Sequence, residues 1–327
     1  MKRNTGIIAR ALREALGGGD AVTGVSPLTT GFSNETYLVE GADLILRLPP
    51  AAGAMLDGHD VIAQARIYEA LARQPVGPPV PAVVHVEEEA ERIGEPFFVM
   101  ARVPGESVND IAMQDWFTGA SDAARRQMSI DWVSAFAALA RLPVLDVLGA
   151  PVSPEDDLRK WQRFAEAAQC PRLAQAIGRL LQSAAPLSGP PAVVHGDTKL
   201  SNLMWQDFRI SAVLDWEMSL NGEPLSDLGY MLYLFESDYH EATRAPRLPG
   251  MIGRAEAIAC WEAASGRSAD GVFWHEIAQI AKITAIIAEG CNMFDTGRSS
   301  DPKLAYFKAN LDHYLDVLDR MLVGGGY

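Results

Sequence analysis

The sequence predicts an α+β protein with two lobes. One is a small lobe with an antiparallel sheet and one main helix, and the other is a large, mostly α-helical lobe that carries a hairpin. Short segments of alternating apolar residues fill the first hundred positions, whereas helical periodicity dominates after residue 103. A polar motif interrupts the helical half at residues 193–228, VVHGDTKLSNLMWQDFRISAVLDWEMSLNGEPLSDL. We therefore expect the two lobes to comprise residues 1–102 and 103–327.

The small lobe is expected to alternate short strands with helices. A helix is predicted at residues 5–16, where three consecutive glycines end it. The main helix is predicted at residues 61–73, because apolar residues recur there on one face, and the proline-rich stretch 75–81 stops it. Strands are predicted at residues 22–28, 35–40, 44–48, 82–87 and 96–102. Residues 29–34 are expected to turn, and residues 52–58 to form a loop.

The large lobe follows a hinge-like segment at residues 103–106, VPGE. Helical periodicity predicts helices at residues 123–142, 154–169, 171–183, 227–235, 251–265, 272–288 and 302–322. Within the polar motif, residues 203–205 and 209–214 are predicted to pair as a hairpin that turns at residues 206–208. The final Gly-Gly-Gly-Tyr is expected to fray.

Bulk composition is that of an ordinary globular protein. The chain has 327 residues, a length that is enough for two lobes with separate cores. Of these residues, 48% are hydrophobic and 21% are charged. The formal net charge of −14 argues against a nucleic-acid partner, which favours a basic patch. The three cysteines, at 170, 260 and 291, are far apart and form no CxxC pair, so neither a disulfide framework nor a zinc site is predicted.

No segment predicts a membrane partner. The N-terminal residues MKRNTGIIARALREAL look like an amphipathic helix and not like a signal peptide. No apolar run approaches the roughly 18 residues of a spanning helix. We therefore expect a cytoplasmic protein with reduced thiols; its oligomeric state is left open.

The spacing within the polar motif suits phosphoryl transfer from a nucleotide. Asp197 follows His195 by two residues, Asn202 comes five residues later, and Asp215 lies thirteen residues beyond Asn202. Such transfer needs one carboxylate to orient and deprotonate a hydroxyl, and an amide oxygen and a second carboxylate to hold Mg²⁺. Because the predicted hairpin joins Asn202 to Asp215, we expect it to bring the two side chains together.

Several motifs together resemble the aminoglycoside phosphotransferase and choline kinase group, which has the protein-kinase-like fold. They are HGDxxxxN and LDWE in the large lobe, and GFSNETYLV, LILRLPP and PFFVMARVPG in the small lobe and hinge. The resemblance covers nearly the whole chain. It is strongest to a broad bacterial phosphotransferase-family branch, similar to the kinase-like domain of some acyl-CoA dehydrogenases.

The resemblance implies roles for the large lobe, residues 103–327, as the catalytic and substrate-binding lobe. Asp197 matches the base that accepts or aims the substrate hydroxyl, and Lys199 matches a lysine that meets the γ-phosphate. Asn202 and Asp215 match the two ligands of Mg²⁺. His195 is expected to shape the loop through hydrogen bonds, and Asp227 to tie this loop to a helix N-terminus.

The resemblance likewise implies that the small lobe, residues 1–102, binds ATP. The turn at residues 29–34 matches the phosphate loop, with Gly31, Phe32, Ser33 and Asn34 as candidate contacts. It has one glycine, so a GxGxxG motif is absent, and a plain hairpin turn is the alternative.

Two residues of the phosphate anchor depart from the kinase pattern. Arg47 stands where a kinase has its phosphate-binding lysine, and the alternative is an edge-strand arginine that faces solvent. Gln64 stands where the helix usually supplies a glutamate, so an Arg47–Gln64 hydrogen bond replaces the ion pair unless Glu69 takes that place.

The hinge is expected to receive the adenine. Backbone groups of Met100, Ala101 and Arg102 match those that meet the edge of the base. Apolar side chains expected to sandwich its ring are Val39, Leu46, Val83 and Met100.

These observations predict an ATP- and Mg²⁺-dependent phosphotransferase that acts on a hydroxyl of a small molecule. The acceptor is expected to be aminoglycoside-like or another metabolite alcohol, including a hydroxyacyl compound. The alternative is a nucleotide-binding pseudokinase or interaction module without turnover. Position alone suggests as substrate contacts Glu217, Glu223, Asp238 and Glu289.

Overall fold

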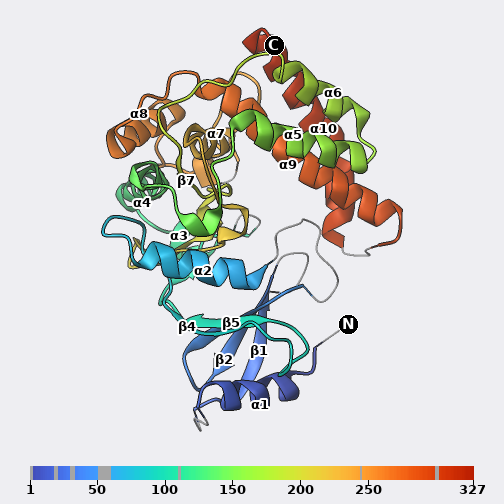
Figure 1. Cartoon of the computed structure of the whole chain (residues 1–327). Coiled ribbons are helices and arrows are strands. Elements are labelled where there is room, and N and C mark those ends of the chain that lie inside the picture. The colour runs from blue at the N-terminus through green and yellow to red at the C-terminus, as the bar shows by residue number, and fades with distance from the viewer. Residues whose placement is uncertain are drawn as a thin grey trace.

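The computed structural model describes residues 3–17, 21–29, 34–50, 60–109, 112–243, 245–298 and 302–327. It has a small lobe around one five-stranded sheet and a larger lobe built mainly of helices, as Figure 1 shows. The predicted α+β, two-lobe fold class is therefore confirmed. The predicted loop at residues 52–58 and the candidate contacts Gly31, Phe32 and Ser33 lie outside the described residues.

All five strands of the small lobe pair antiparallel, in the order β1-β2-β3-β5-β4. Their bounds are β1 (Gly24–Thr29), β2 (Glu35–Glu40), β3 (Leu44–Leu48), β4 (Val83–Glu87) and β5 (Phe97–Ala101). Two helices accompany the sheet, α1 (Thr5–Ala15) and α2 (Val61–Ala72). Side chains cap both helices, because Asn4 accepts hydrogen bonds from the first amides of α1 and Asp60 from those of α2.

Alternation along the strands assigns each side chain to one of two faces of this sheet. Tyr37, Val39, Leu46 and Val99 pack in a core with α1, whereas Ile45, Phe98 and Met100 pack in a core with α2. The α2 core continues into the large lobe, so the two lobes share one set of buried apolar residues.

The lobe boundary can be compared with the strand pairing. β5 ends at Ala101, and the next strand, β6 (Glu106–Ser107), pairs with β8 of the large lobe. We therefore propose that the boundary between the two lobes lies between residues 102 and 103, as the sequence suggested, although the α2 core extends across this boundary.

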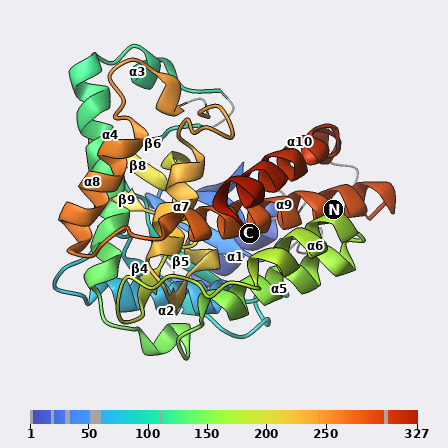
Figure 2. The same cartoon turned by 90° about the horizontal axis from the view of Figure 1, so that it is seen from above.

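The large lobe contains eight α-helices among the described segments. They are α3 (Asp115–Thr118), α4 (Asp122–Ala137), α5 (Pro154–Ala167), α6 (Pro171–Leu180), α7 (Leu225–Tyr233), α8 (Arg254–Ser265), α9 (Val272–Asp295) and α10 (Pro302–Gly325). Short 3-10 turns are η1 (Ala138–Arg141), η2 (Asp146–Leu148), η3 (Leu200–Asn202), η4 (Trp216–Met218) and η5 (Ala245–Arg247). From above, α9 and α10 lie side by side with α5 and α6 against them (Figure 2).

Two small sheets carry the polar motif. β7 (Ala192–Val194) pairs with β10 (Leu220–Gly222), and β8 (Leu203–Gln206) pairs with β9 (Arg209–Val213). The second pair is the predicted hairpin, and both residues of its turn, Asp207 and Phe208, have positive φ, as a type I′ turn requires. β7 and β10 were not predicted, because each has only three residues and the two pair across a long stretch of sequence instead of a short turn.

The expectation that the last residues fray is wrong. α10 continues through Gly325, and Arg179 Nη2 donates to the Tyr327 backbone oxygen over 2.5 Å. Packing is tight at this end, since a Cβ on Gly324 would lie 2.2 Å from the Tyr239 hydroxyl oxygen and the Tyr239 side chain would have to move. Close packing across the lobe therefore overrides the low helix propensity of these glycines.

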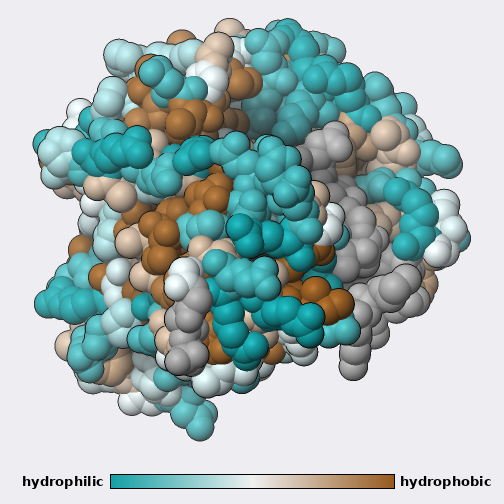
Figure 3. Space-filling view, turned by 60° about the horizontal axis from the view of Figure 1, so that its bottom comes forward, coloured by the Kyte–Doolittle hydropathy of each residue, from teal (hydrophilic) through white to brown (hydrophobic). Residues whose placement is uncertain are grey.

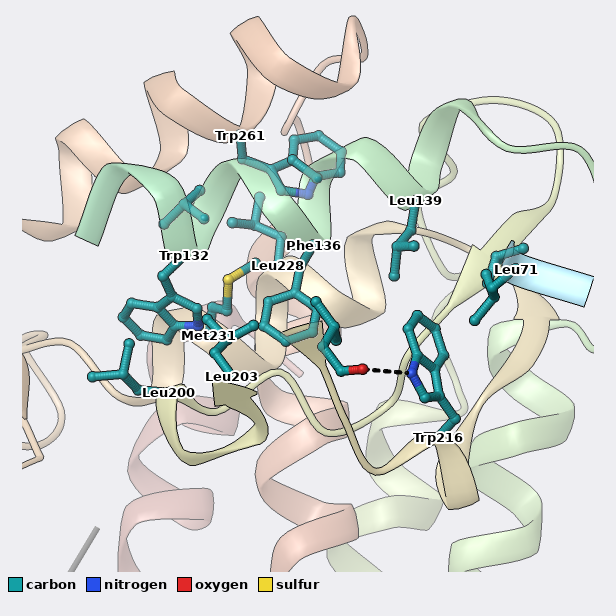
Figure 4. Close-up of a cluster of buried hydrophobic side chains, with 14 of the residues drawn as sticks. Leu71, Trp132, Phe136, Leu139, Leu200, Leu203, Trp216, Leu228, Met231 and Trp261 are labelled. Carbon is teal, nitrogen blue, oxygen red and sulfur yellow. Dashed lines mark hydrogen bonds between the residues drawn. The ribbon is translucent and has the colours of Figure 1, made fainter. Parts of the chain in front are cut away.

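Large apolar side chains hold the polar motif against the helices. Trp132 and Phe136 of α4 lie with Leu200, Leu203 and Trp216 of the motif, as Figure 4 shows. All are buried, and the Trp216 indole donates to the Val213 backbone oxygen over 3.2 Å. The polar motif therefore rests on a packed core and is not a loose surface loop.

Polar residues cover most of the surface on the side of the small lobe, with apolar residues in small patches (Figure 3). Among the helices of the described segments, none combines the length and the apolar character needed to cross a membrane. The cytoplasmic location stays a prediction from the sequence.

A buried histidine on α9 predicts acid sensitivity of the fold. His275 is fully buried with Nε2 2.7 Å from the Pro186 backbone oxygen, and burial lowers its pKa to about 4 although this contact and Glu155 oppose the shift. Since the unfolded side chain has a pKa near about 6.5, the unfolded state binds the extra proton as the pH falls. Between about pH 6.5 and pH 4 the fold should therefore lose about 3 kcal/mol at this residue.

Urea titrations at several pH values would measure this loss. His275→Gln keeps a donor for Pro186 but does not titrate, so it should remove most of the acid sensitivity in this window. His313→Gln, a change of an exposed histidine on α10, is the control and should leave it intact. Equal acid sensitivity in the wild type and His275→Gln would contradict this account.

Candidate active site

The loop after β7 turns sharply to present the first polar residues of the motif. Gly196 has φ +81°, and a Cβ at this residue would lie 2.4 Å from the Met218 backbone oxygen. Only glycine fits such a conformation and such an approach. The neighbouring strand β10, which pairs with β7, thus fixes where the loop leaves the sheet.

Asp227 in the first turn of α7 holds this loop from below. Its carboxylate accepts the backbone N–H groups of His195 and Gly196, both over 2.8 Å, and its own backbone oxygen accepts from the Thr198 hydroxyl over 3.0 Å. The side chain is 2% exposed, and burial raises its pKa, whereas His195 and these N–H groups oppose the rise. Asp227 therefore ties the loop to the N-terminus of a helix.

His195 has both ring nitrogens in use. Nε2 lies 2.9 Å from the Leu214 backbone oxygen, and Nδ1 accepts the Asp197 N–H over 3.2 Å. The ring is fully buried and contacts Phe136 and Trp216 edge-on or tilted. This arrangement fits a residue that shapes the loop.

The Asp197 carboxylate is the centre of the site. It is 7% exposed, and its Oδ2 accepts from Asn202 Nδ2 and pairs with Lys199 Nζ, each at 2.9 Å. Burial alone would raise its pKa, but the charge of Lys199 and hydrogen bonds from Tyr230, Lys199 and Asn202 lower the pKa to about 2. The carboxylate is therefore ionised at neutral pH, with a lysine beside it.

The hairpin brings Asn202 and Asp215 together, as the sequence predicted. The Leu214 N–H donates to the Asn202 backbone oxygen over 2.8 Å, which joins the two ends of the hairpin next to Asp215. Asn202 Nδ2 donates to both the backbone oxygen and Oδ2 of Asp197, so its Oδ1 points away from Asp197. This leaves an amide oxygen as a hard ligand for a cation.

Asp215 adopts the left-handed conformation, with φ 66° and ψ 58°, and its N–H donates to the Tyr68 hydroxyl of α2 over 3.2 Å. Burial and the nearby carboxylate of Glu217 raise its pKa, and Arg47 opposes this rise. A surplus of negative charge at Asp215 suits a cation bound between it and Asn202.

The two residues therefore fit a Mg²⁺ ion, although no group of three or more His, Cys, Asp or Glu in the described segments is arranged to hold a metal. Mg²⁺ commonly binds through one or two protein oxygens and completes its shell with water and substrate phosphates. Two ligands suffice for such a site.

Arg47 links the sheet, the main helix and Asp215. Nη1 donates to the Thr36 hydroxyl over 2.6 Å, and Nη2 reaches Gln64 Oε1 at 3.5 Å and Asp215 Oδ1 at 3.4 Å. Arg47 lies on an inner strand with its side chain 13% exposed, so the alternative of a solvent-facing edge residue is wrong. The side chain from α2 that meets it is Gln64, whereas Glu69 pairs with Arg66.

Asn34 is the last residue of the predicted phosphate loop, residues 29–34, and it is described by the structure. Asn34 is 2% exposed, and within the described part of the chain neither its amide oxygen nor its amide nitrogen has a hydrogen-bond partner. Gln64 Nε2 is likewise buried without a partner. Buried amide groups without partners are costly, so these two side chains are suited to binding a ligand.

The hinge differs in part from the expectation. Ala101 donates its N–H to the Ala82 backbone oxygen over 2.8 Å, and Arg102 donates its N–H to the Asp43 backbone oxygen over 3.1 Å. These two donors are used inside the small lobe and do not point to a base. The contact of Met100, Ala101 and Arg102 with adenine thus stays a prediction that rests on their other backbone groups.

Two of the apolar residues expected around the adenine lie on the wrong face of the sheet. Val39 and Leu46 are fully buried in the core with α1. Their neighbours Leu38 and Ile45 face the α2 side, where Ile45 pairs with Met100. The error is a shift of one residue in each strand, which moves a side chain to the opposite face.

The positions suggested for substrate contacts do not form one group. Glu223 caps α7 by accepting the Leu225 N–H over 3.1 Å and Glu289 pairs with Arg298 over 2.8 Å, so both carboxylates have structural partners. Asp238 is exposed, and Glu217 lies close enough to raise the pKa of Asp215. Of the four, Glu217 alone is tied to the site by an interaction described above.

Sequence reasoning missed two residues at the site. Tyr230 of α7 hydrogen-bonds to the Asp197 carboxylate, and Lys282 of α9 donates to the Gly196 backbone oxygen over 2.5 Å. Lys282 is 4% exposed, and burial lowers its pKa. For Lys282 the sequence did contain a signal, a single lysine within an apolar helical segment. A lysine is rarely buried without a partner, so this pattern could have indicated a buried polar contact.

Comparison with known proteins identifies the class. The model of the phosphotransferase enzyme family matches residues 24–264, so the chain belongs to this family. It is 29% identical over 251 residues to rat (Rattus norvegicus) acyl-CoA dehydrogenase family member 11, and the matched region covers 73% of this chain and 30% of that protein. Mouse (Mus musculus) acyl-CoA dehydrogenase family member 10 is 31% identical over 210 residues, with 61% and 19% covered. The chain thus spans less than a third of these curated relatives.

Solved structures share the fold across nearly the whole chain. A candidate aminoglycoside phosphotransferase from Ralstonia eutropha has a TM-score of 0.77 at 20% identity, with 98% of each chain covered. The streptomycin–ATP complex of APH(2″)-IIa has a TM-score of 0.59 at 16% identity, with 91% of this chain and 94% of that chain covered. The gentamicin complex of the same enzyme gives 0.63 at 15% identity, with 97% and 99% covered. The predicted resemblance and the kinase-like fold are therefore confirmed.

Proposed function

We propose that the protein transfers the γ-phosphate of ATP to a hydroxyl of a small molecule. The observation that carries the proposal is the convergence of Asp197, Asn202 and Asp215 from a loop and a hairpin of a phosphotransferase-family fold. These groups are the base and the cation ligands that such a transfer needs.

Asp197 is the proposed base. Its ionised carboxylate would accept a hydrogen bond from the acceptor hydroxyl and aim the oxygen at the phosphorus, taking the proton as the new bond forms. Lys199, which pairs with Asp197 in the structure, would turn its ammonium group to the charge on the transferred phosphoryl group.

The nucleotide would lie between the lobes. Asn202 Oδ1 and Asp215 would hold Mg²⁺, which neutralises phosphate charge when bound. Arg47, next to Asp215, would bind phosphate oxygens together with the side chain of Asn34 and with Gly31, Phe32 and Ser33. Gln64 would keep Arg47 in place without adding a negative charge.

Two acceptor classes are proposed, and both are alcohols. The solved relatives include complexes with aminoglycosides, which supports an aminoglycoside-like acceptor. The curated relatives carry the name acyl-CoA dehydrogenase, which supports a hydroxyacyl compound. The second class is favoured by identity, since the curated relatives are the more similar in sequence.

A pseudokinase without turnover remains the rival class. The Gln64 and Arg47 departures favour it, whereas the intact set of Asp197, Asn202 and Asp215 argues for turnover. Binding of nucleotide is common to both classes, and catalysis separates them.

Thermal unfolding with and without Mg²⁺-ATP tests the nucleotide site. ATP at about 100 times its dissociation constant should stabilise the wild type by about 2.7 kcal/mol. Arg47→Met removes a charged partner of phosphate and should weaken ATP binding tenfold or more, because such hydrogen bonds contribute about 1.5–3 kcal/mol. Arg66→Met, a change of an exposed arginine in the same lobe, is the control and should bind like the wild type. No stabilisation of the wild type by ATP or GTP would contradict the proposal.

A further inference from the structure

Tyr230 meets the Asp197 carboxylate from the side of the helices. It lies on α7, three residues after Asp227, so the two side chains project from the same face of one helix. Asp227 holds the backbone of His195 and Gly196, while Tyr230 hydrogen-bonds to the side chain of Asp197. One helix therefore holds both the backbone and the carboxylate of the loop.

Lys282 of α9 lies over the ring of Tyr230. Its ammonium group lies 5.9 Å from the centre of the Tyr230 ring and 5.7 Å from that of Trp161. The same group donates to the Gly196 backbone oxygen over 2.5 Å. Because a buried ammonium group over an aromatic ring is attractive, Lys282 limits the movement of the ring. α7 and α9 also pack closely, since a Cβ on Gly229 would lie 2.8 Å from the Glu276 nitrogen.

We propose that Tyr230 is a positioning residue that keeps the Asp197 carboxylate aimed at the acceptor hydroxyl during transfer. The inference rests on the proposed function and adds a residue to it. Tyr230 itself would touch neither the nucleotide nor the reacting hydroxyl.

The other two donors to Asp197 are expected to change during the reaction, and Tyr230 is not. Lys199 would leave Asp197 for the phosphate, and Asn202 would tighten around Mg²⁺ through its other amide atom. A hydroxyl on a packed helix needs no such movement. The Tyr230 hydroxyl therefore keeps the Asp197 carboxylate in one orientation when Lys199 and Asn202 turn to the substrate. A small change in that orientation would lower the rate of transfer strongly.

The test compares two tyrosines of the same helix. Tyr230→Phe keeps the ring and the packing against Lys282 but removes the hydroxyl. Tyr233→Phe is the matched control, because its hydroxyl bonds to Tyr314 and is not among the groups that act on Asp197. Hydrogen–deuterium exchange of residues 195–202, Mg²⁺-ATP affinity and steady-state kinetics are measured for both.

For Tyr230→Phe we expect kcat about tenfold lower, unchanged Mg²⁺-ATP affinity and several-fold faster exchange of the loop. Tyr233→Phe should match the wild type in all three. Unchanged loop exchange in Tyr230→Phe, or an unchanged kcat, overturns the inference. If the wild type turns over no acceptor, the proposed function fails, and loop exchange alone then decides whether Tyr230 holds Asp197.

Discussion

Asp197→Asn should lower the rate of phosphoryl transfer by about three orders of magnitude while ATP binding stays intact. A positioned base contributes about 10²–10⁴-fold to such reactions, and an amide cannot take the proton. The variant keeps the size of the side chain and one oxygen that can accept from Asn202 or Lys199. The loss should therefore appear in kcat and not in the affinity for Mg²⁺-ATP.

The fold should tolerate this change. Lys199, the ionic partner of Asp197, has 35% of its side chain exposed, so water can replace the carboxylate. Asp207→Asn is the matched control, since Asp207 is exposed at the hairpin turn and asparagine accepts its φ of 50°. A turnover of Asp197→Asn within tenfold of the wild type would show that Asp197 is not the base.

Asp227→Asn should destabilise the protein by about 2–3 kcal/mol and also slow the reaction. The carboxylate accepts two backbone N–H groups, and an amide can accept only one of them, because its NH₂ group faces the other. Each such bond to a charged acceptor contributes about 1.5–3 kcal/mol, and the relief from burying a charge offsets part of the loss.

Urea unfolding and kinetics on the same samples measure the two consequences. Asp312→Asn changes an exposed carboxylate on α10 and should alter stability by less than about 0.5 kcal/mol. If Asp227→Asn unfolds at the same urea concentration as the wild type, the two N–H bonds do not hold the loop as described.

The sequence was sufficient where chemistry and local turns define the structure. The meeting of Asn202 and Asp215 followed from a hairpin predicted to turn at residues 206–208, and the structure has a two-residue turn at Asp207 and Phe208. The family resemblance narrowed the partner of Arg47 on the next helix to Gln64 or Glu69, and the structure places Gln64 beside it.

The sequence was insufficient where the role of a side chain depends on which face of a sheet it occupies or on a contact partner far away in the chain. Val39 and Leu46 were assigned to the wrong side of the sheet, because both faces of these strands carry apolar residues and the alternation does not show which face is the cleft. Tyr230 and Lys282 could not be found, since they lie on helices α7 and α9 and contact loop residues far from them in the sequence. Such contacts depend on packing and leave no local pattern.

The most direct test of phosphoryl transfer is release of ADP from Mg²⁺-ATP in the presence of a panel of hydroxylated acceptors. The panel should contain aminoglycosides and hydroxyacyl thioesters, and the proteins compared are the wild type, Asp197→Asn and Asp207→Asn. We predict that at least one acceptor raises ADP release by the wild type and by Asp207→Asn about a thousandfold above that of Asp197→Asn. Release by the wild type that no acceptor raises above the Asp197→Asn level would contradict the account.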